Sequence, residues 1–295
     1  MKENCRYQIR VMIGVGFFLL MAATFQAMGQ DDASDASKIE PKNAQPSLTD
    51  GLIAYFPFDE NFKDYSGNKN HGRPSNGPKL AKGAIGSAAS FDGKDDFVFV
   101  LPKSDVSKIG DFTLSVWTHV EDWKEGKRAG PRFRNSQYIF DGHTASPMFR
   151  EDDFHRPGFF AIYGLTDHGE EIHNGVHMQP GRKWYWEQKI PAKLKGCWRH
   201  MVFTRKGDED VTYLDGQRQK SAHAYANKHA RPLDMQHPWF IGTFAGNALD
   251  HRGIASGINY SFHGRLDDMR IYNRALMPKE VELLYRQRDT EPGSE

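Results

Sequence analysis

Residues 111–120 read Asp-Phe-Thr-Leu-Ser-Val-Trp-Thr-His-Val, and this stretch decides the class of fold. Phe112, Leu114 and Val116 occupy every second position, and mostly polar residues stand between them. Because the side chains of a β-strand point alternately to its two faces, this period of two predicts a half-buried strand.

Further short strands are predicted on both sides of this stretch, at residues 97–101, 198–205, 239–242 and 262–272. A hairpin is predicted where Asp215-Gly216 separates the run Val211–Leu214 from Gln217–Gln219. Asp-Gly favours the positive φ angles that a type I′ turn requires, and such a turn joins two antiparallel strands.

Only one helix is expected, from about residue 278 to residue 287. Pro278 suits a first helical turn, and Val281, Leu284 and Tyr285 form an apolar stripe at helical spacing. Many short strands with Gly-rich turns and one short helix predict an all-β sandwich or barrel.

The composition excludes several classes of protein. The 295 residues carry 39 Lys and Arg against 38 Asp and Glu, a formal net charge of +1. A general nucleic-acid binder normally has a basic excess, so this near-neutral balance predicts no nucleic-acid partner. Only 2 Cys are present, which excludes a disulfide scaffold and a multi-Cys zinc module.

The N-terminus has the pattern of a secretory signal peptide over residues 1–29. Lys2, Arg6 and Arg10 precede the apolar run 11–23, and Ala27-Met28-Gly29 places small residues before a cleavage site at Gln30. The run is short against the roughly 20 residues of a membrane span, although an uncleaved anchor is the alternative. We therefore expect a secreted or periplasmic protein with no membrane span after cleavage.

The rest of the chain is expected to hold one domain. Residues 30–48 are polar, small and Pro-containing, which is typical of a flexible linker. Residues 49–288 form one periodic stretch without a second linker, and residues 289–295 are a polar tail that we expect to be disordered.

Two distant segments carry a resemblance to a known family. Residues 51–59 (GLIAYFPFD) are followed by 64–72 (DYSGNKNHG) and 90–93 (SFDG), and residues 262–276 read FHGRLDDMRIYNRAL. With the 111–120 strand and the Asp-Gly hairpin, these motifs resemble the laminin-G-like jelly-roll domain of the concanavalin A-like lectin/glucanase superfamily, from about residue 50 to residue 287.

The resemblance implies an all-β, two-sheet antiparallel jelly-roll sandwich with one short C-terminal helix. It also implies that the first strand lies near the last, which brings Phe58-Asp59 close to Leu266-Asp267-Asp268. Function is less narrowly implied, because this fold carries lectins, adhesion modules, glucanases and lyases.

A bound calcium ion is the first site hypothesis. Ca²⁺ takes about six to eight oxygen ligands from carboxylates, amides and backbone carbonyls. The loop after the first strand offers Asp59, Asp64, Asn68 and Asn70, and Asp267 adds a carboxylate from the penultimate strand. Related domains often hold a calcium ion at this position, and the resemblance itself implies Asp59, Asn68 and Asp267 as its ligands.

An alternative reading needs no metal. The stretch beginning at Asp64 also has the composition of an ordinary Asx turn. In that reading Asp267 or Asp268 pairs with Arg265 or Arg270.

Catalysis is not favoured, and no catalytic residue is assigned. Glucanases of the superfamily carry Glu-x-Asp-x-x-Glu on one strand, a motif that this sequence lacks, and the nearest acidic cluster at 167–171 contains a Gly turn. Faint similarities to polysaccharide lyases at 149–152, 171–173 and 270–273 leave a lyase or glycoside hydrolase as a lesser alternative.

Aromatic residues of the long middle region predict a ligand surface, for which the candidates are Tyr163, Trp184, Tyr185 and Trp186. Strand alternation sets Tyr185 opposite the two Trp, so one face of that segment shows aromatic surface or packs under a loop. Such rings stack on the apolar faces of sugars, although most of them could instead lie in the core. We therefore expect a secreted binding module for a polysaccharide or glycan, or alternatively for an extracellular protein.

Overall fold

The computed structural model describes residues 47–123, 134–142, 158–166, 169–177, 184–207, 209–220, 233–244 and 260–290. The predicted signal peptide, most of the predicted linker and residues 291–295 lie outside these ranges. Among the described residues, no helix has both the length and the hydropathy that a membrane crossing requires.

The described strands form two sheets, and every pair of neighbouring strands is antiparallel. The eight-stranded sheet consists of β13 (Gln217–Arg218), β12 (Glu209–Leu214), β11 (Trp198–Lys206), β6 (Phe112–Val120), β15 (His263–Tyr272), β4 (Ser87–Asp92) and β3 (Lys79–Lys82), with β1 (Leu52–Phe56) also paired to β15. The seven-stranded sheet consists of β10 (Trp184–Pro191), β9 (Gly169–His177), β8 (Gly158–Thr166), β7 (Arg134–Asp141), β14 (Trp239–Ile241), β5 (Phe97–Val100) and β2 (Gly72–Ser75).

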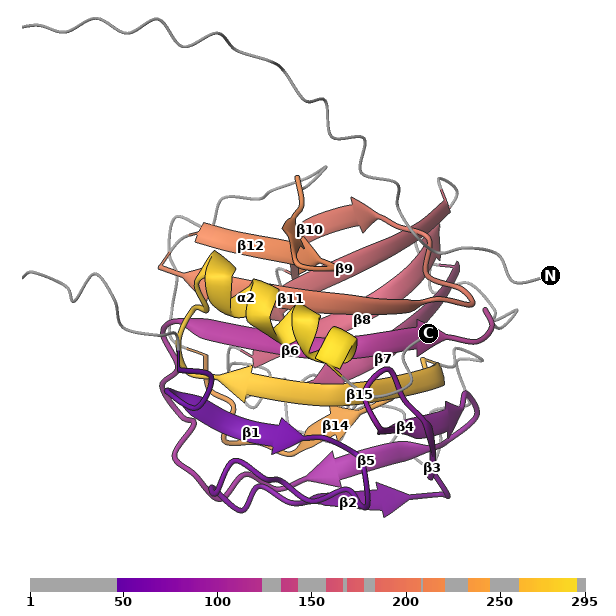
Figure 1. Ribbon diagram of the computed structural model, residues 1–295, viewed down its shortest axis with the longest axis horizontal. Coiled ribbons are helices and arrows are strands. Elements are labelled where there is room, and N and C mark those ends of the chain that lie inside the picture. Colours follow the sequence, from indigo (N-terminus) through magenta and orange to yellow (C-terminus); the bar gives the residue numbers. More distant parts are fainter. Residues whose placement is uncertain are drawn as a thin grey trace, which may run out of the picture. The chain divides into compact units, whose positions relative to one another are not determined.

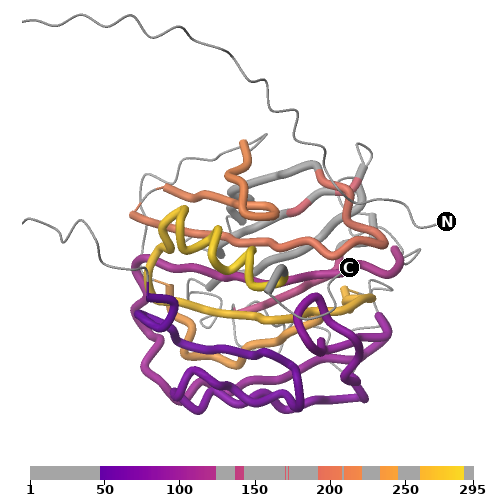
Figure 2. The backbone as a smooth tube through the Cα atoms, viewed as in Figure 1, coloured from indigo at the N-terminus to yellow at the C-terminus, as the bar shows by residue number. Residues whose placement is uncertain are grey.

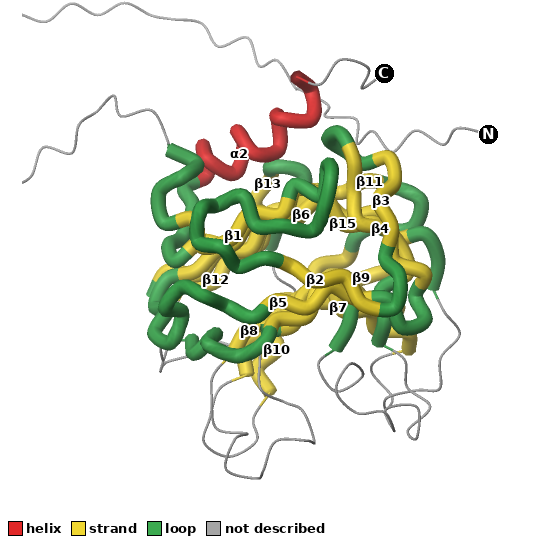
Figure 3. Tube along the Cα trace, turned by 90° about the horizontal axis from the view of Figure 1, so that it is seen from below, coloured by secondary structure: helices red, strands yellow, loops and turns green. Residues whose placement is uncertain are grey.

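The two sheets pack face to face as a sandwich, with the helix α2 (Pro278–Arg286) outside the eight-stranded sheet (Figures 1 and 3). The core between the sheets takes alternate residues from each strand. In β5, for example, Val98 and Val100 are fully buried, whereas Phe97 and Phe99 are only partly buried. Burying one such side chain contributes about 1.5–3 kcal/mol, so the alternation predicted from sequence determines which face turns inward.

The strand expected to be half-buried is buried on both faces. Every residue of β6 except His119 is buried, because α2 covers the outer face of its sheet. A second apolar cluster lies there, in which Tyr272 and Val202 of the sheet pack with Val281 and Leu284 of α2. The alternation was therefore predicted correctly, but the exposed second face was wrong.

The remaining local predictions are confirmed. The hairpin joins β12 to β13, and Asp215 and Gly216 have φ angles of 52° and 76°, both in the left-handed region. The helix α2 begins at Pro278, and the buried Glu280 accepts a hydrogen bond from the backbone N–H of Met277 at 2.7 Å. A short 3₁₀ helix, η3 (Gln287–Thr290), follows it and includes two residues of the expected tail.

The first and last strands lie side by side, as the resemblance implies (Figure 2). β1 pairs with β15 in a register that sets Phe56 opposite Met269. The entering chain is held there too, because the Tyr272 hydroxyl donates to the carbonyl of Leu48 at 3.1 Å. Leu48 packs against the second apolar cluster, so the end of the expected linker is part of the folded domain.

Candidate functional site

An acidic site lies where the loop after β1 meets β15. The register of β15 against β6 shifts between Asp267 and Arg270, and Asp268 has a φ of 47°. This irregularity sets two consecutive carboxylates, those of Asp267 and Asp268, beside the loop that carries Asp59. Asp59 and Asp267 both accept hydrogen bonds from the backbone at the loop between β3 and β4, so the two ends of the domain meet here, and the charge of Asp59 contributes to the raised pKa of Asp267 and of Asp268.

Asp267 is fully buried and only partly satisfied. Its Oδ2 accepts hydrogen bonds from the N–H groups of Ala84 and Ile85 at 2.8 and 2.9 Å. Its buried Oδ1 has no hydrogen-bond partner in the described structure. Burial raises the pKa of Asp267 to about 8, with further contributions from the charges of Asp268 and Asp59. A buried carboxylate oxygen without a partner is costly, and a cation would satisfy it.

The loop between β3 and β4 contacts the carboxylates of Asp59 and Asp267 through its backbone, including two glycines. Asp59 Oδ1 accepts the N–H of Ser87 at 2.9 Å. A Cβ atom on Gly86 would lie 2.2 Å from Asp59 Oδ1, and one on Gly83 would lie 2.5 Å from Asp267 Oδ2. The same Cβ on Gly83 would lie 2.8 Å from the carbonyl oxygen of Ile85 and 2.7 Å from that of Ser87, so both carbonyls lie close to Asp267 Oδ2. Carboxylate and carbonyl oxygens converging on a backbone loop are the donor set that Ca²⁺ prefers, so the residues fit that ion.

Asp268 has a different set of contacts. Its Oδ1 accepts a hydrogen bond from Arg270 Nη2 at 3.1 Å, and the Arg270 guanidinium stacks on the ring of Tyr55 at 4.4 Å. Burial raises the pKa of Asp268, and Arg270 opposes that shift. The arginine pairing considered from the sequence therefore occurs at Asp268, which leaves Asp267 without a cationic partner among the described residues.

The other three predicted ligands bind the backbone of β1, Asp64 at Tyr55 and Asn68 and Asn70 at Leu52 and Ile53. The Asp64 carboxylate accepts four hydrogen bonds, from the backbone of Tyr55, Ser66 and Asn70 and from the Ser66 hydroxyl. The Ser66 contact closes an Asx turn. Asn70 is fully buried and binds Ile53, Lys103 and Ser104, and Asn68 donates to the carbonyls of Leu52 and Ile53. These contacts shape the loop after β1, and the three side chains do not converge with Asp59 and Asp267.

The predicted aromatic ligand residues lie in the seven-stranded sheet, at positions known from the backbone register. Tyr163 of β8 is opposite Ile172 of β9, which is buried in the core. Tyr185 is opposite Val176, which lies an even number of residues from Ile172 and so on the same face of β9. Trp184 and Trp186 are opposite His177 and Gly175, which lie an odd number of residues from Ile172 and so on the other face. Trp184 and Trp186 therefore share the outer face of the sheet, and Tyr163 and Tyr185 hold inner positions.

The register extends this outer face across the whole sheet. One position from each strand joins a single row, the aromatic row, which consists of Arg73, Phe99, Phe240, Asp141, Phe160, Gly175 and Trp186. Four of these seven residues are aromatic, and the rings of Phe99 and Phe240 meet edge to face at 5.5 Å. Phe99, Phe240 and Asp141 had not been identified from the sequence, because only strand pairing aligns residues so far apart in the chain.

The comparison with solved structures gives the same fold at low sequence identity. Domain 4 of an extracellular arabinanase from Geobacillus stearothermophilus, solved with arabinotriose, has 19% identity and a TM-score of 0.52, over 79% of this chain and 98% of that one. The binding domain of Paraclostridial mosquitocidal protein 1 has 19% identity and a TM-score of 0.56, over 81% of this chain and 53% of that one. At these identities the likeness concerns the fold alone.

The receptor-binding domain of botulinum neurotoxin D is a third relative in fold, with 14% identity and a TM-score of 0.56 over 81% of this chain and 53% of its own length. This chain thus spans about half of each toxin domain. No curated protein matches the sequence. A family model described as the concanavalin A-like lectin/glucanases superfamily, of the laminin G type, matches residues 92–282, which is well over half of the chain. The chain therefore belongs to the laminin G-like family of the concanavalin A-like lectin/glucanases superfamily.

Proposed function

We propose that this protein is a secreted, non-catalytic binding domain that holds a polysaccharide on the outer face of its seven-stranded sheet and carries a structural calcium ion at Asp59 and Asp267. The aromatic row carries this proposal. Neighbouring strands lie about 4.8 Å apart, so a row through seven strands runs for about 29 Å. That length suits an extended oligosaccharide better than a single sugar.

The chemistry of the row supports a glycan. Aromatic rings stack on the apolar faces of sugars, and polar side chains between them hydrogen-bond to hydroxyls. Arg73 is exposed at one end of the row and Phe99 next to it is half-buried, whereas Phe240 and Asp141 in its middle are 1% and 0% exposed, so Arg73 and Phe99 are the described side chains of the row that a ligand can reach. A structure of the same fold was solved with arabinotriose, which makes arabinan a natural first probe.

The test is retention of the purified protein on a panel of immobilised polysaccharides that includes arabinan. We expect Trp186→Ala to weaken retention about tenfold or more. Tyr65→Ala is the matched control, because Tyr65 is an aromatic residue that is 53% exposed and lies outside the row. Equal loss in both variants would contradict the assignment of the row.

Two other outcomes would point to the alternative functions. Absence of retention on every polysaccharide, together with a stable extracellular protein partner, would favour an adhesion or scaffold module. Release of reducing ends or of unsaturated uronates from the panel would identify a glycoside hydrolase or a lyase.

A mature N-terminus at Gln30 in protein exported by the cell would support secretion.

The calcium ion would have a structural role. Asp59 and Asp267 would hold it together with carbonyls of the loop between β3 and β4, and its charge would tie that loop, β1 and β15 together. An ion that binds only the folded state raises stability by mass action, by about 2.7 kcal/mol at one hundred times its Kd.

Calorimetry with calcium and with a chelator tests this proposal without any assay of activity. We expect a clear drop in Tm on chelation in the wild type and none in Asp267→Asn. Asp95→Asn is the control, because Asp92, Asp95 and Asp96 form a separate acidic group whose carboxylates lie within 4.8 Å of one another. A Tm that does not respond to the chelator would remove the calcium site.

A further inference from the structure

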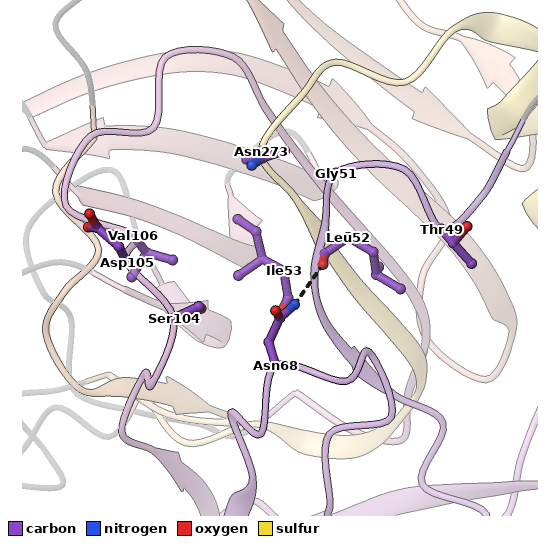
Figure 4. A pocket seen from close by; sticks show the side chains of 9 residues that line it. All are labelled: Thr49, Gly51, Leu52, Ile53, Asn68, Ser104, Asp105, Val106 and Asn273. Carbon is purple, nitrogen blue, oxygen red and sulfur yellow. Dashed lines mark hydrogen bonds between the residues drawn. The ribbon is translucent and has the colours of Figure 1, made fainter.

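A small polar pocket opens at the start of β1, at the end of that strand away from Asp59 (Figure 4). Its volume is about 170 Å³, and it is lined by Thr49, Gly51, Leu52, Ile53, Asn68, Ser104, Asp105, Val106 and Asn273. Pockets for drug-sized ligands measure about 300–1,000 Å³, so this one suits a single small ring.

The pocket walls come from four separate segments that hydrogen bonds hold together. The buried Asn70 donates to the carbonyl of Ile53 at 2.9 Å and to Ser104 Oγ at 3.0 Å, and its Oδ1 accepts the N–H of Lys103 at 2.6 Å. The backbone N–H of Asn273 donates to the carbonyl of Gly51 at 2.9 Å. The pocket is therefore formed in advance, which lowers the entropic cost of binding.

Polar atoms at its rim are fixed in place and still available. Asn68 donates through Nδ2 to the carbonyls of Leu52 (Figure 4) and Ile53. Its Oδ1 accepts no hydrogen bond from the described residues. Asp105 Oδ1 accepts from the N–H and hydroxyl of Ser107, and its Oδ2 likewise has no partner among the described residues. Ser104 Oγ accepts from Asn70 and can still donate its own proton.

The lining combines these acceptors with an apolar wall. Ile53 and Val106 also line the pocket and are 5% and 1% exposed, so they offer it a small apolar surface. The hydrogen bonds from Ser107 lower the pKa of Asp105, so its carboxylate is ionised at neutral pH and repels an anionic ligand. A neutral ligand whose hydroxyl groups donate to Asn68 and Asp105, and whose ring carbons contact Ile53 and Val106, fits this arrangement best.

We propose that this pocket binds one neutral sugar residue through its hydroxyl groups, as a second carbohydrate site separate from the aromatic row. No aromatic residue lines the pocket, so hydrogen bonds carry the recognition. We therefore expect weak affinity that depends strongly on the stereochemistry of the hydroxyl groups. The site lies at the turn into β1, whereas the row crosses the other sheet, so either site can exist without the other.

The test is NMR titration of the ¹⁵N-labelled protein with methyl glycosides of glucose, galactose, mannose, xylose and arabinose up to 100 mM. Glycerol serves as the second probe, because it offers hydroxyls without a ring. We expect one or two glycosides to shift the amide signals of Gly51, Leu52, Asn68 and Asp105, with at most small shifts from glycerol.

Two variants test the assigned contacts. Asp105→Asn keeps an oxygen for Ser107 and loses the charged acceptor, and we expect it to weaken binding at least fivefold with an unchanged Tm. Asn273→Ala changes another wall and should also weaken binding. Asp95→Asn is the control of matched chemistry outside the pocket, and Trp186→Ala should leave these shifts intact even if it abolishes polysaccharide retention.

Several results would overturn the proposal. These are the absence of shifts at these amides with every glycoside, equal shifts with glycerol, undiminished binding in Asp105→Asn, or the same shifts with calcium chloride alone. The last result would make the pocket a cation site. None of these results tests the proposal that the aromatic row binds a polysaccharide, which the panel of immobilised polysaccharides tests separately.

Discussion

The outer faces of the two sheets both carry aromatic rings, but these rings differ in how far they are buried. On the eight-stranded sheet, Trp117 is 1% exposed, and its ring stacks at 5.6 Å on that of Tyr285, which belongs to the helical stripe of α2. On the seven-stranded sheet, Phe97 and Phe99 remain half-buried, although Phe240 and Asp141 of the same outer face are 1% and 0% exposed. Aromatic content on an outer face therefore does not identify a binding surface, because a helix far along the chain can cover it.

The largest expected effect separates the covered face from the open one. Trp117→Ala removes a fully buried ring and should lower the free energy of unfolding by about 3–5 kcal/mol. Phe99→Ala removes a half-buried ring and should cost much less. Urea denaturation of both variants measures the difference, and equal losses would show that the seven-stranded sheet is covered as well.

The covered face also predicts a pH dependence through His200. Its ring lies beside those of Trp117 and Tyr285, with centroids 4.9 and 6.1 Å away, and its Nε2 lies 2.9 Å from Ser115 Oγ. Burial lowers the pKa of His200 to about 3, with a further contribution from the charge of Arg270. The folded protein keeps the ring neutral, whereas the unfolded chain protonates it near pH 6.5.

Stability from His200 is thus complete above about pH 6.5 and is lost as the pH falls toward 3. At pH 5 the loss should be about 2 kcal/mol. Urea denaturation at pH 7 and pH 5 checks this in the wild type and in His200→Gln, which should lack this part of the pH dependence. Identical pH profiles for the two proteins would mean that His200 is protonated in the folded state without penalty.

A third prediction concerns Asp267, whose folded pKa is raised to about 8. The effect of pH on stability is opposite to that of His200. Ionisation of the Asp267 carboxyl destabilises the calcium-free fold as the pH rises from about 4 toward 8. Calcium must displace the proton, so its affinity should rise about tenfold per unit between pH 6 and pH 7 and level off near pH 8. Calcium titrations at these three pH values measure this slope, and a pH-independent affinity would exclude Asp267 as a ligand.

The smallest expected effect is on the open face. Trp186→Ala should weaken polysaccharide binding about tenfold, or about 1.4 kcal/mol, with little change in stability because β10 is the edge strand of its sheet. Retention on the polysaccharide measures the change in binding, and urea denaturation measures the change in stability. A large loss of stability without loss of retention would place the open face elsewhere.

Local chemistry accounts for what could be predicted from the sequence. The alternation of residues 112–120, the positive φ of Asp215-Gly216 and the apolar stripe of α2 each depend on neighbours within a few residues. The meeting of Asp59 with Asp267 followed from the family resemblance, since the two residues are far apart in the chain. Asp64, Asn68 and Asn70 were harder to assign, because an Asx turn and a metal-binding loop use the same residue types.

The sequence by itself determined the strands, the hairpin, the helix and the side of each strand that turns inward, because these depend on periodicity along the chain. Only the tertiary structure decided that α2 covers Trp117, that seven strands align Arg73 to Trp186, and that Asn68 and Asp105 line one pocket. The physical reason is that strand register and layer packing join segments with no local relation, and burial is settled only when all the layers are in place.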